Sequence, residues 1–361
     1  MSVTTVSRVR ALEWRGARIP PALFVGLLCL AVAGLADALL RHEKGISGDE
    51  PFYERMAAHP GAPHSFPYAY RIAVPWLVHA LPFSQVVSFQ LLALVLIAAS
   101  GAALYALMRD LAAPPLLAGA LAVGFAVSPT LLVALLRHGR NIDPATILVV
   151  ILGCVFIVRR QKLALAVTLL IGVAVKETSL FLVPFAYAVW ARRLVDRDAL
   201  RDVALVSVTP VAGYVALRTS IPATGSQYTP EFRGSFVHVR LEVFRQAFSG
   251  SEPRRLAYTY GPLWVVAPFA LLGVPFARRG LVLIAVCLLA MTVSYDSPRI
   301  IFLAAPVFYV AAALVLQNRR RLALATVIAL FAMDVGYAGY MQVHGAQQGL
   351  DTNPATPVPV S

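Results

Sequence analysis

Charged residues are scarce in this chain of 361 residues: only 14% are Asp, Glu, Lys or Arg, whereas 59% are hydrophobic. A soluble domain typically has about a quarter of its residues charged, and no polar block here is long enough to form one. These features exclude a soluble globular protein. They predict an all-α, polytopic transmembrane helical bundle.

Cysteine is also scarce, and its spacing excludes two kinds of site. The three cysteines, Cys29, Cys154 and Cys287, lie far apart inside apolar runs. Without a CxxC pair, neither a structural zinc site nor a disulfide framework is expected. The sequence therefore predicts no required cofactor. A divalent cation at the acidic pair described below is compatible with the sequence but is not indicated by it.

The few charges are unbalanced, with a net charge of +13. In a soluble protein such an excess would suggest nucleic-acid binding. Here membrane topology explains it, because eleven apolar stretches have the length of membrane spans. They are 21–41, 84–108, 114–136, 143–158, 163–175, 178–191, 202–218, 259–277, 281–295, 301–317 and 322–341.

The positive-inside rule fixes the expected orientation. With eleven spans and a cytoplasmic N-terminus, the inner segments hold 17 of the 31 Lys and Arg residues but only 5 of the 18 acids. Treating 163–191 as a single span would place the later arginine clusters outside. We therefore expect a hairpin of two short arms that meet at Lys176-Glu177, and no nucleic-acid partner.

The short hairpin has a consequence for its tip. Arms of 13 to 14 residues cover about 20 Å at the helical rise, less than the hydrocarbon thickness of about 30 Å. Lys176 and Glu177 should then lie below the outer surface, where charges persist only in a water-filled cavity. The same reasoning applies to Arg137, Arg140 and Asp143.

This topology divides the chain into a cytoplasmic segment (1–20), one transmembrane domain (21–341) and a flexible outer tail (342–361). The first apolar run has full span length and no small-residue cleavage site, so we expect an anchor rather than a signal peptide. Two outer loops, 42–83 and 219–258, each contain an amphipathic stretch, FPYAYRIAVPWLVHALP and SFVHVRLEVFRQAF. Both stretches predict interfacial helices that contact membrane lipids.

An acidic pair, Asp49-Glu50, follows the first span. Ionisable groups at the mouth of a membrane cavity are unfavourable there unless they serve a function. Three further short motifs accompany this GDE sequence (48–50): YRIAVP at 70–75, VKET at 175–178 and DSPRI at 296–300. With the topology, they resemble the GT-C superfamily of polytopic membrane glycosyltransferases. Members of that superfamily carry an acidic motif and interfacial helices in the first outer loop.

The resemblance implies an enzyme of the bacterial cytoplasmic membrane whose active site faces outward. It would move a hexosyl or pentosyl group, with inversion, from a polyprenyl-phosphate donor to a glycan, lipid or protein acceptor. Asp49 is the expected general base, with Glu50 as the alternate. Arg71, Lys176 and Arg299 are expected to bind the phosphate. Glu177, Tyr53 and Arg140 complete the candidate substrate-binding set.

Each candidate also has a purely structural interpretation. Asp49 would cap a helix whose first turn contains Pro51, and Arg71 would extend to lipid headgroups. Lys176 and Glu177 would pair with each other or cap the hairpin. Arg299 would pair with Asp296, three residues away. For Asp143, which precedes Pro144, the sequence favours helix capping alone.

Two other functions remain open. A transporter or flippase for a lipid-linked saccharide or another anionic lipid would use the same basic cavity, although the chain shows no internal repeat of the kind common in transporters. A non-catalytic scaffold for envelope assembly would not depend on these charged residues.

Overall fold

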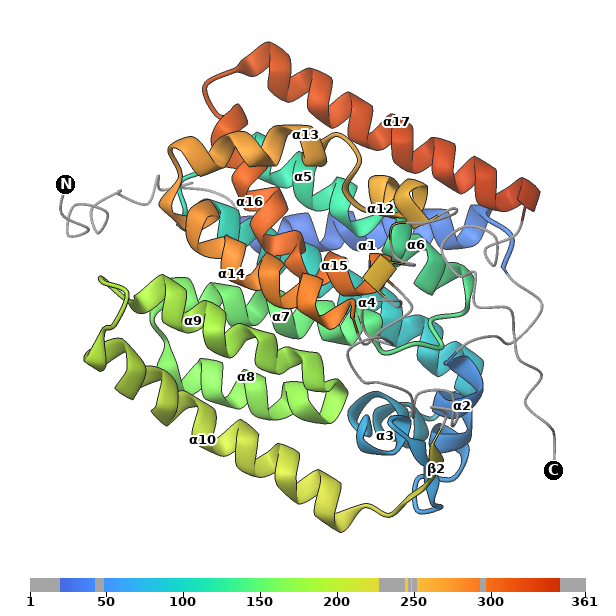
Figure 1. Cartoon of the computed structure of the whole chain (residues 1–361). Coiled ribbons are helices and arrows are strands. Elements are labelled where there is room, and N and C mark those ends of the chain that lie inside the picture. Colours follow the sequence, from blue (N-terminus) through green and yellow to red (C-terminus); the bar gives the residue numbers. More distant parts are fainter. Residues whose placement is uncertain are drawn as a thin grey trace.

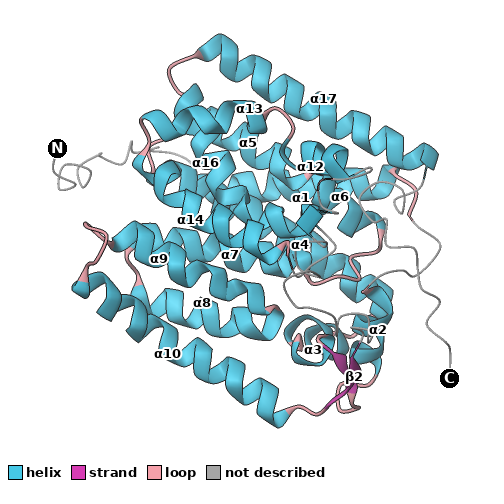
Figure 2. Cartoon of the chain, in the orientation of Figure 1, coloured by secondary structure: helices cyan, strands magenta, loops and turns pink. Residues whose placement is uncertain are grey.

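The computed structural model describes residues 20–42, 49–226, 244–245, 248, 252–292 and 297–344. In these parts the chain is helical apart from two short strands (Figure 1, Figure 2). Asp296, nearly all of the second predicted interfacial helix and most of the predicted tail lie outside the described residues. The prediction of an all-α fold is confirmed.

The first half of the bundle is built around a long central helix. Its elements are α1 (Pro21–Leu39), α4 (Gln85–Asp110), α5 (Pro115–Ala126), α6 (Pro129–Leu136) and α7 (Asp143–Arg159). Helix α4, which the Ser84 hydroxyl caps, packs against α1, α5 and α7. Helices α5 and α6 form one predicted span bent by 42°. The bend falls at Ser128-Pro129, because proline has no N–H and disfavours helix at the residue before it.

The predicted hairpin is present. It consists of α8 (Lys162–Val175), η3 (Glu177–Phe181) and α9 (Leu182–Trp190), and α10 (Arg197–Ser220) follows it. Asp196 caps α10 by accepting hydrogen bonds from the amides of Asp198 and Ala199. Helix α8 packs between α7 and α10, so the hairpin tip is held at one end of the bundle.

The second half supplies the most buried of the five long candidate spans, Ser297–Leu316. Its elements are α12 (Glu252–Tyr260), α13 (Leu263–Val266), η5 (Ala267–Leu272), α14 (Pro275–Ala290), α15 (Ser297–Ile301), η6 (Phe302–Ala304), α16 (Ala305–Leu316) and α17 (Arg320–His344). Nearly every side chain of α16 is buried. Tyr260, Phe302 and Phe308 stack in this core, with ring centroids of Tyr260 and Phe308 4.1 Å apart.

Small elements cover one end of the bundle, at the lower right of Figure 1. They are α2 (Glu50–Ala58), β1 (His64–Phe66), η2 (Tyr68–Tyr70), α3 (Ala73–Ala80) and β2 (Ala223–Ser226). Strands β1 and β2 pair in parallel, with His64 opposite Ala223, and so join the chain after α10 to the first loop. Helix α3 is shorter than the predicted interfacial helix and begins only after Arg71. Its Trp76 and Leu77 side chains are exposed.

Five helices are long and apolar enough to cross a membrane, and the bent pair α5–α6 raises the number to six among the described residues. The five are α1, α4, α10, Ser297–Leu316 and Arg320–Val343. Each of the eleven predicted stretches overlaps one helix or several adjoining ones. The others, α8 among them, are shorter, so the number of eleven spans stays a prediction.

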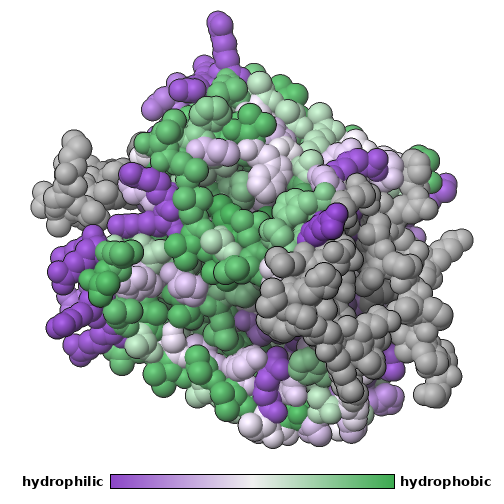
Figure 3. Space-filling view, viewed as in Figure 1, coloured by the Kyte–Doolittle hydropathy of each residue, from purple (hydrophilic) through white to green (hydrophobic). Residues whose placement is uncertain are grey.

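The surface fits this composition. Apolar side chains point outward from the candidate spans, as Leu35, Val208 and Val335 do. Figure 3 shows hydrophobic residues across the middle of one face and hydrophilic ones gathered toward its left edge. A broad apolar surface of this kind marks a protein that contacts lipid or partner proteins rather than water.

Candidate functional site

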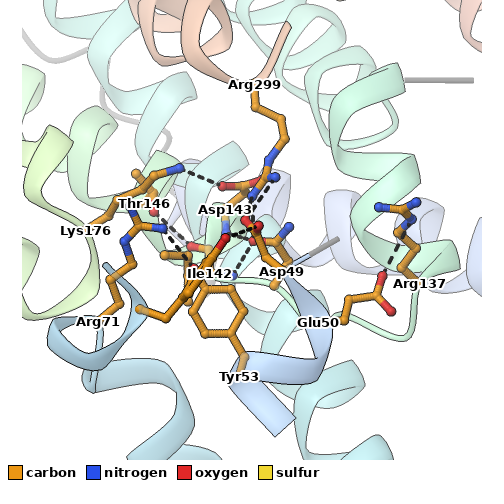
Figure 4. Close-up of polar contacts among 12 residues, drawn as sticks. Asp49, Glu50, Tyr53, Arg71, Arg137, Ile142, Asp143, Thr146, Lys176 and Arg299 are labelled. Carbon is orange, nitrogen blue, oxygen red and sulfur yellow. Dashed lines mark hydrogen bonds and ion pairs between the residues drawn. The ribbon is translucent and has the colours of Figure 1, made fainter. Parts of the chain in front are cut away.

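Charged side chains from five separate parts of the chain meet at the bundle end that carries α2 and α3 (Figure 4). We call them the charged cluster: Asp49, Arg71, Asp143, Lys176, Glu177 and Arg299. Five of these six are predicted site residues. The sixth, Asp143, is expected from the sequence to lie in the same cavity, but its pattern favours a helix cap over a role in binding.

Arg299 lies at the centre of the cluster. Both of its Nη atoms lie 3.2 Å from Asp49 Oδ2. Its Nε donates to Asp143 Oδ2, and its Nη2 donates to Asn141 Oδ1 at 3.0 Å. A guanidinium presents several N–H donors in a fixed planar fork, so it can serve three acceptor side chains at once. Arg299 therefore does more than form a local pair in its own turn.

Asp49 precedes α2 but its side chain does not cap that helix, so the capping interpretation is wrong. Its Oδ1 accepts a hydrogen bond from the Tyr68 hydroxyl at 2.7 Å, and its side chain remains 22% exposed. Burial raises the pKa of Asp49, but the charges of Arg299 and Arg71 outweigh burial and hold that pKa below its usual value. The carboxylate is thus ionised, shielded and still accessible.

Asp143 is the first residue of α7, and the capping interpretation fails for it too. The Asn141 side chain, not Asp143, accepts the amide hydrogen bonds of Ile142 and Asp143, at 2.6 and 3.3 Å. The Asp143 carboxylate instead binds Arg299, and its Oδ1 lies 3.4 Å from Lys176 Nζ. The one sequence signal for this role is the placement of an acid at the end of an apolar stretch.

Arg71 is buried, with 8% exposure, so it does not extend to headgroups. It binds Glu177 through two hydrogen bonds, of 2.7 Å from Nη2 and 3.2 Å from Nε. Its Nη1 donates to the Tyr53 hydroxyl at 3.2 Å. Burial raises the pKa of Glu177, but Arg71 outweighs burial and lowers that pKa to about 2. Glu177 therefore pairs with Arg71 and not with Lys176.

Lys176 follows the last residue of α8 and is also 8% exposed. Burial lowers its pKa, the nearby charges of Arg299 and Arg71 lower it further, and Asp143 offsets only part of this. The carboxylate of Asp143 therefore neutralises the Lys176 ammonium only in part. A further anion beside Lys176 would stabilise its charged form.

Glu50 and Arg140 are predicted site residues that lie apart from the charged cluster. Glu50 points away from Asp49 toward Arg137, with 3.6 Å between Oε1 and Nε (Figure 4). Arg140 Nε lies 2.8 Å from Glu54 Oε1, and its Nη1 lies 4.0 Å from Glu50 Oε2. The two adjacent acids thus face different cations.

The charged cluster is balanced, with three cations facing three carboxylates. Its cations bring several N–H donors together, as a phosphate requires. Two of its carboxylates are partly open, with side-chain exposures of 22% for Asp49 and 31% for Glu177. Among the described residues, no group of three or more His, Cys, Asp or Glu side chains is arranged to hold a metal ion.

Comparison with protein-family models gave no match, and comparison with curated proteins gave none either. The charged cluster and its surroundings are therefore the basis for assigning a function.

Proposed function

We propose that this protein is a membrane glycosyltransferase that moves a sugar from a polyprenyl-phosphate donor to an acceptor hydroxyl. The observation that carries the proposal is a partly open carboxylate, Asp49, set among Arg71, Lys176 and Arg299 at one end of an apolar bundle. A lipid phosphate needs these same features, since its head is anionic and its tail apolar.

The chemistry requires few groups. Cleavage of a sugar ether needs a general acid as well as a second carboxylate. A phosphate leaving group needs no proton, so one base to deprotonate the acceptor can suffice. Cations near the phosphate stabilise the charge that develops as it departs. In the charged cluster, Asp49 would be the base, and Arg71, Lys176 and Arg299 would stabilise the phosphate.

The reaction is a single displacement. The acceptor oxygen attacks the anomeric carbon while the bond from that carbon to the phosphate oxygen breaks, so the configuration inverts. The acceptor proton passes to Asp49, and the bonding electrons leave with the phosphate. Arg299 links the two events. Its positive charge makes Asp49 a weak base, and a bound phosphate would offset that charge and so make Asp49 a stronger base.

A shallow groove between α8 and α10 offers a place for the lipid tail. It has a volume of about 470 Å³ and is lined by residues such as Leu170, Ile171 and Leu217. This volume is within the roughly 300–1,000 Å³ of small-molecule sites. On α8 the groove reaches Ala174, two residues before Lys176. A tail in the groove would lie close to a phosphate bound at Lys176.

The eleven-span arrangement, with the N-terminus inside a bacterial cytoplasmic membrane, would set the charged cluster on the outer face. Exposed arginines support this orientation. Arg160, Arg193 and Arg319 occupy turns at helix ends opposite to those that carry Asp143, Lys176 and Arg299. Arginine-rich turns are typical of the cytoplasmic side.

Mass spectrometry of the lipids that co-purify with the protein tests the donor. The wild-type protein should retain a polyprenyl-phosphate sugar, and Lys176→Gln should reduce its occupancy. Asp110→Asn is the matched control, because it removes a charge from an exposed ion pair remote from the site. Recovery of ordinary phospholipids alone would contradict the proposal. Movement of the lipid across liposomes without a new glycosidic bond would favour the transporter.

A further inference from the structure

The second predicted acid, Glu50, occupies an environment unlike that of Asp49. Its side chain is 2% exposed, whereas that of Asp49 is 22% exposed. Glu50 faces Arg137 and Arg140 on the side of α2 opposite to Arg299, as Figure 4 shows for Arg137. A general base must reach the proton that it removes, and a carboxylate enclosed by protein cannot reach a substrate hydroxyl.

Glu54 adds a second contact from the same helix. It lies four residues after Glu50, hence on the same face of α2. Its Oε1 lies 2.8 Å from Arg140 Nε. One face of α2 therefore holds two arginines of the turn between α6 and α7.

That turn leads directly to the charged cluster. His138 and Gly139 both have a positive φ, of 57° and 62°. A Cβ on Gly139 would lie 2.6 Å from the Phe89 carbonyl oxygen, so the turn presses against α4. Asn141 and Asp143 follow at once, and both accept hydrogen bonds from Arg299.

We infer that Glu50 is a positioning residue that acts through Arg137 and Arg140. Its buried charge compensates the two arginines and fixes segment 137–142, so that Asn141 and Asp143 hold Arg299 against Asp49. The effect on sugar transfer rests on the proposed function, whereas the effect on the segment does not. The two acids thus have different roles: Asp49 contacts the substrate, and Glu50 supports the segment that positions Arg299.

A charge-matched pair of variants separates positioning from catalysis. Glu50→Gln keeps the shape of the side chain but removes the negative charge that Glu50 supplies to the buried Arg137, which is unfavourable. The double variant Glu50→Gln with Arg137→Gln removes both charges and should restore most of the structure, since replacing a whole buried pair is often nearly neutral. Glu54→Gln is the control. The Glu54 side chain is 20% exposed, and of the two arginines it contacts only Arg140.

Two measurements are made on the purified full-length protein. Hydrogen exchange of peptides that cover 137–142 should be at least about tenfold faster in Glu50→Gln, return close to the wild-type rate in the double variant, and change less in Glu54→Gln. Release of polyprenyl phosphate from a polyprenyl-phosphate hexose should follow the same order. Sugar transfer should decline at acid pH in Glu50→Gln as it does in the wild type, because Asp49, the proposed base, is unchanged.

The outcomes are distinct. Lost transfer with unchanged exchange would show that Glu50 acts on the substrate and would overturn the inference. Faster exchange that the double variant does not reverse would overturn it as well, because the ion pair would not be the cause. Reversed exchange in a protein that transfers no sugar would support positioning by Glu50 while contradicting the proposed function.

Discussion

Arg299 donates hydrogen bonds to three different side chains, Asp49, Asp143 and Asn141. It joins the start of α2 to the turn before α7 and the first residue of α7, and both regions are far from Arg299 in sequence. A guanidinium can serve several acceptors at fixed angles, whereas an ammonium group acts as a point charge. Both the geometry and the charge of this residue should therefore matter.

Arg299→Lys should keep the local charge but lose the planar set of donors. Each charge-assisted hydrogen bond contributes about 1.5–3 kcal/mol, so we expect the rate of sugar transfer to fall by an order of magnitude or more. Arg299→Gln should also lower the melting temperature, because Asp49 and Asp143 lose their shared cation. Initial rates and thermal unfolding in detergent measure both effects. Wild-type rates in Arg299→Lys would contradict the role of the fork.

Glu177 gives a pH dependence with a defined sign. Its pKa in the folded protein is about 2, below the value of about 4.3 expected when unfolded. Its charge therefore stabilises the fold above about pH 4.3, and this stabilisation is lost as the pH falls toward 2. When the pH is lowered from 6 to 3, the melting temperature of Glu177→Gln should therefore fall by less than that of the wild type. An equal loss in both proteins would exclude this contribution.

The sequence predicted part of the site at the residue scale. Asp49, Arg71, Lys176, Glu177 and Arg299 are unusual in place and charge, and they do meet in the fold. Asp143 was misassigned because its local pattern, an acid before proline at a helix start, matches a common cap. Its real partners lie 33 and 156 residues away. No local pattern encodes contacts at that separation.

A pair of charged residues, Lys176-Glu177, correctly predicted the break after α8, whereas two breaks marked by proline were not predicted. Ser128-Pro129 separates α5 from α6, and Pro275 begins α14 inside a stretch predicted as one span, 259–277. Hydropathy alone missed both breaks, because proline within an apolar run hardly changes its average. The turn between α6 and α7 was likewise not foreseen as a support for the site.

Gly139 in that turn allows a direct test. Gly139→Ala would place a side chain at positive φ and against the Phe89 carbonyl oxygen. We expect a loss of at least about 1 kcal/mol in stability and slower sugar transfer. Gly34→Ala is the control, since no atom lies within 4 Å of the added Cβ and alanine favours a helix. Equal behaviour of the two variants would show that the turn is not constrained.

At the scale of the whole molecule, the charged cluster and the arginine-rich turns lie at opposite ends of the helices. The sequence predicted this separation from charge counts, since arginine is retained on the cytoplasmic side. Five or six of the described helices have the full length of a span, so the number of eleven spans stays a prediction. A helix of 14 residues such as α8 covers about 20 Å, less than the hydrocarbon thickness of about 30 Å, so its length alone does not identify it as a span.

Cysteine labelling in intact cells tests this orientation. Ala62→Cys lies in the exposed loop between α2 and β1, and Leu194→Cys lies in the turn after α9, where Leu194 is 93% exposed. An impermeant maleimide should label the first from outside and the second only after permeabilisation. The native cysteines are buried and give little background. The reverse pattern would invert the proposed orientation.

The most direct test of the central claim compares wild-type protein with Asp49→Asn in proteoliposomes. A polyprenyl phosphate that carries a hexose or pentose serves as donor, and envelope extract supplies the acceptor. Mass spectrometry then follows the new glycosidic bond and the released polyprenyl phosphate. We predict transfer by the wild type and a fall of about 100-fold or more in Asp49→Asn, with donor binding and melting temperature nearly unchanged. Wild-type turnover in Asp49→Asn would contradict the account.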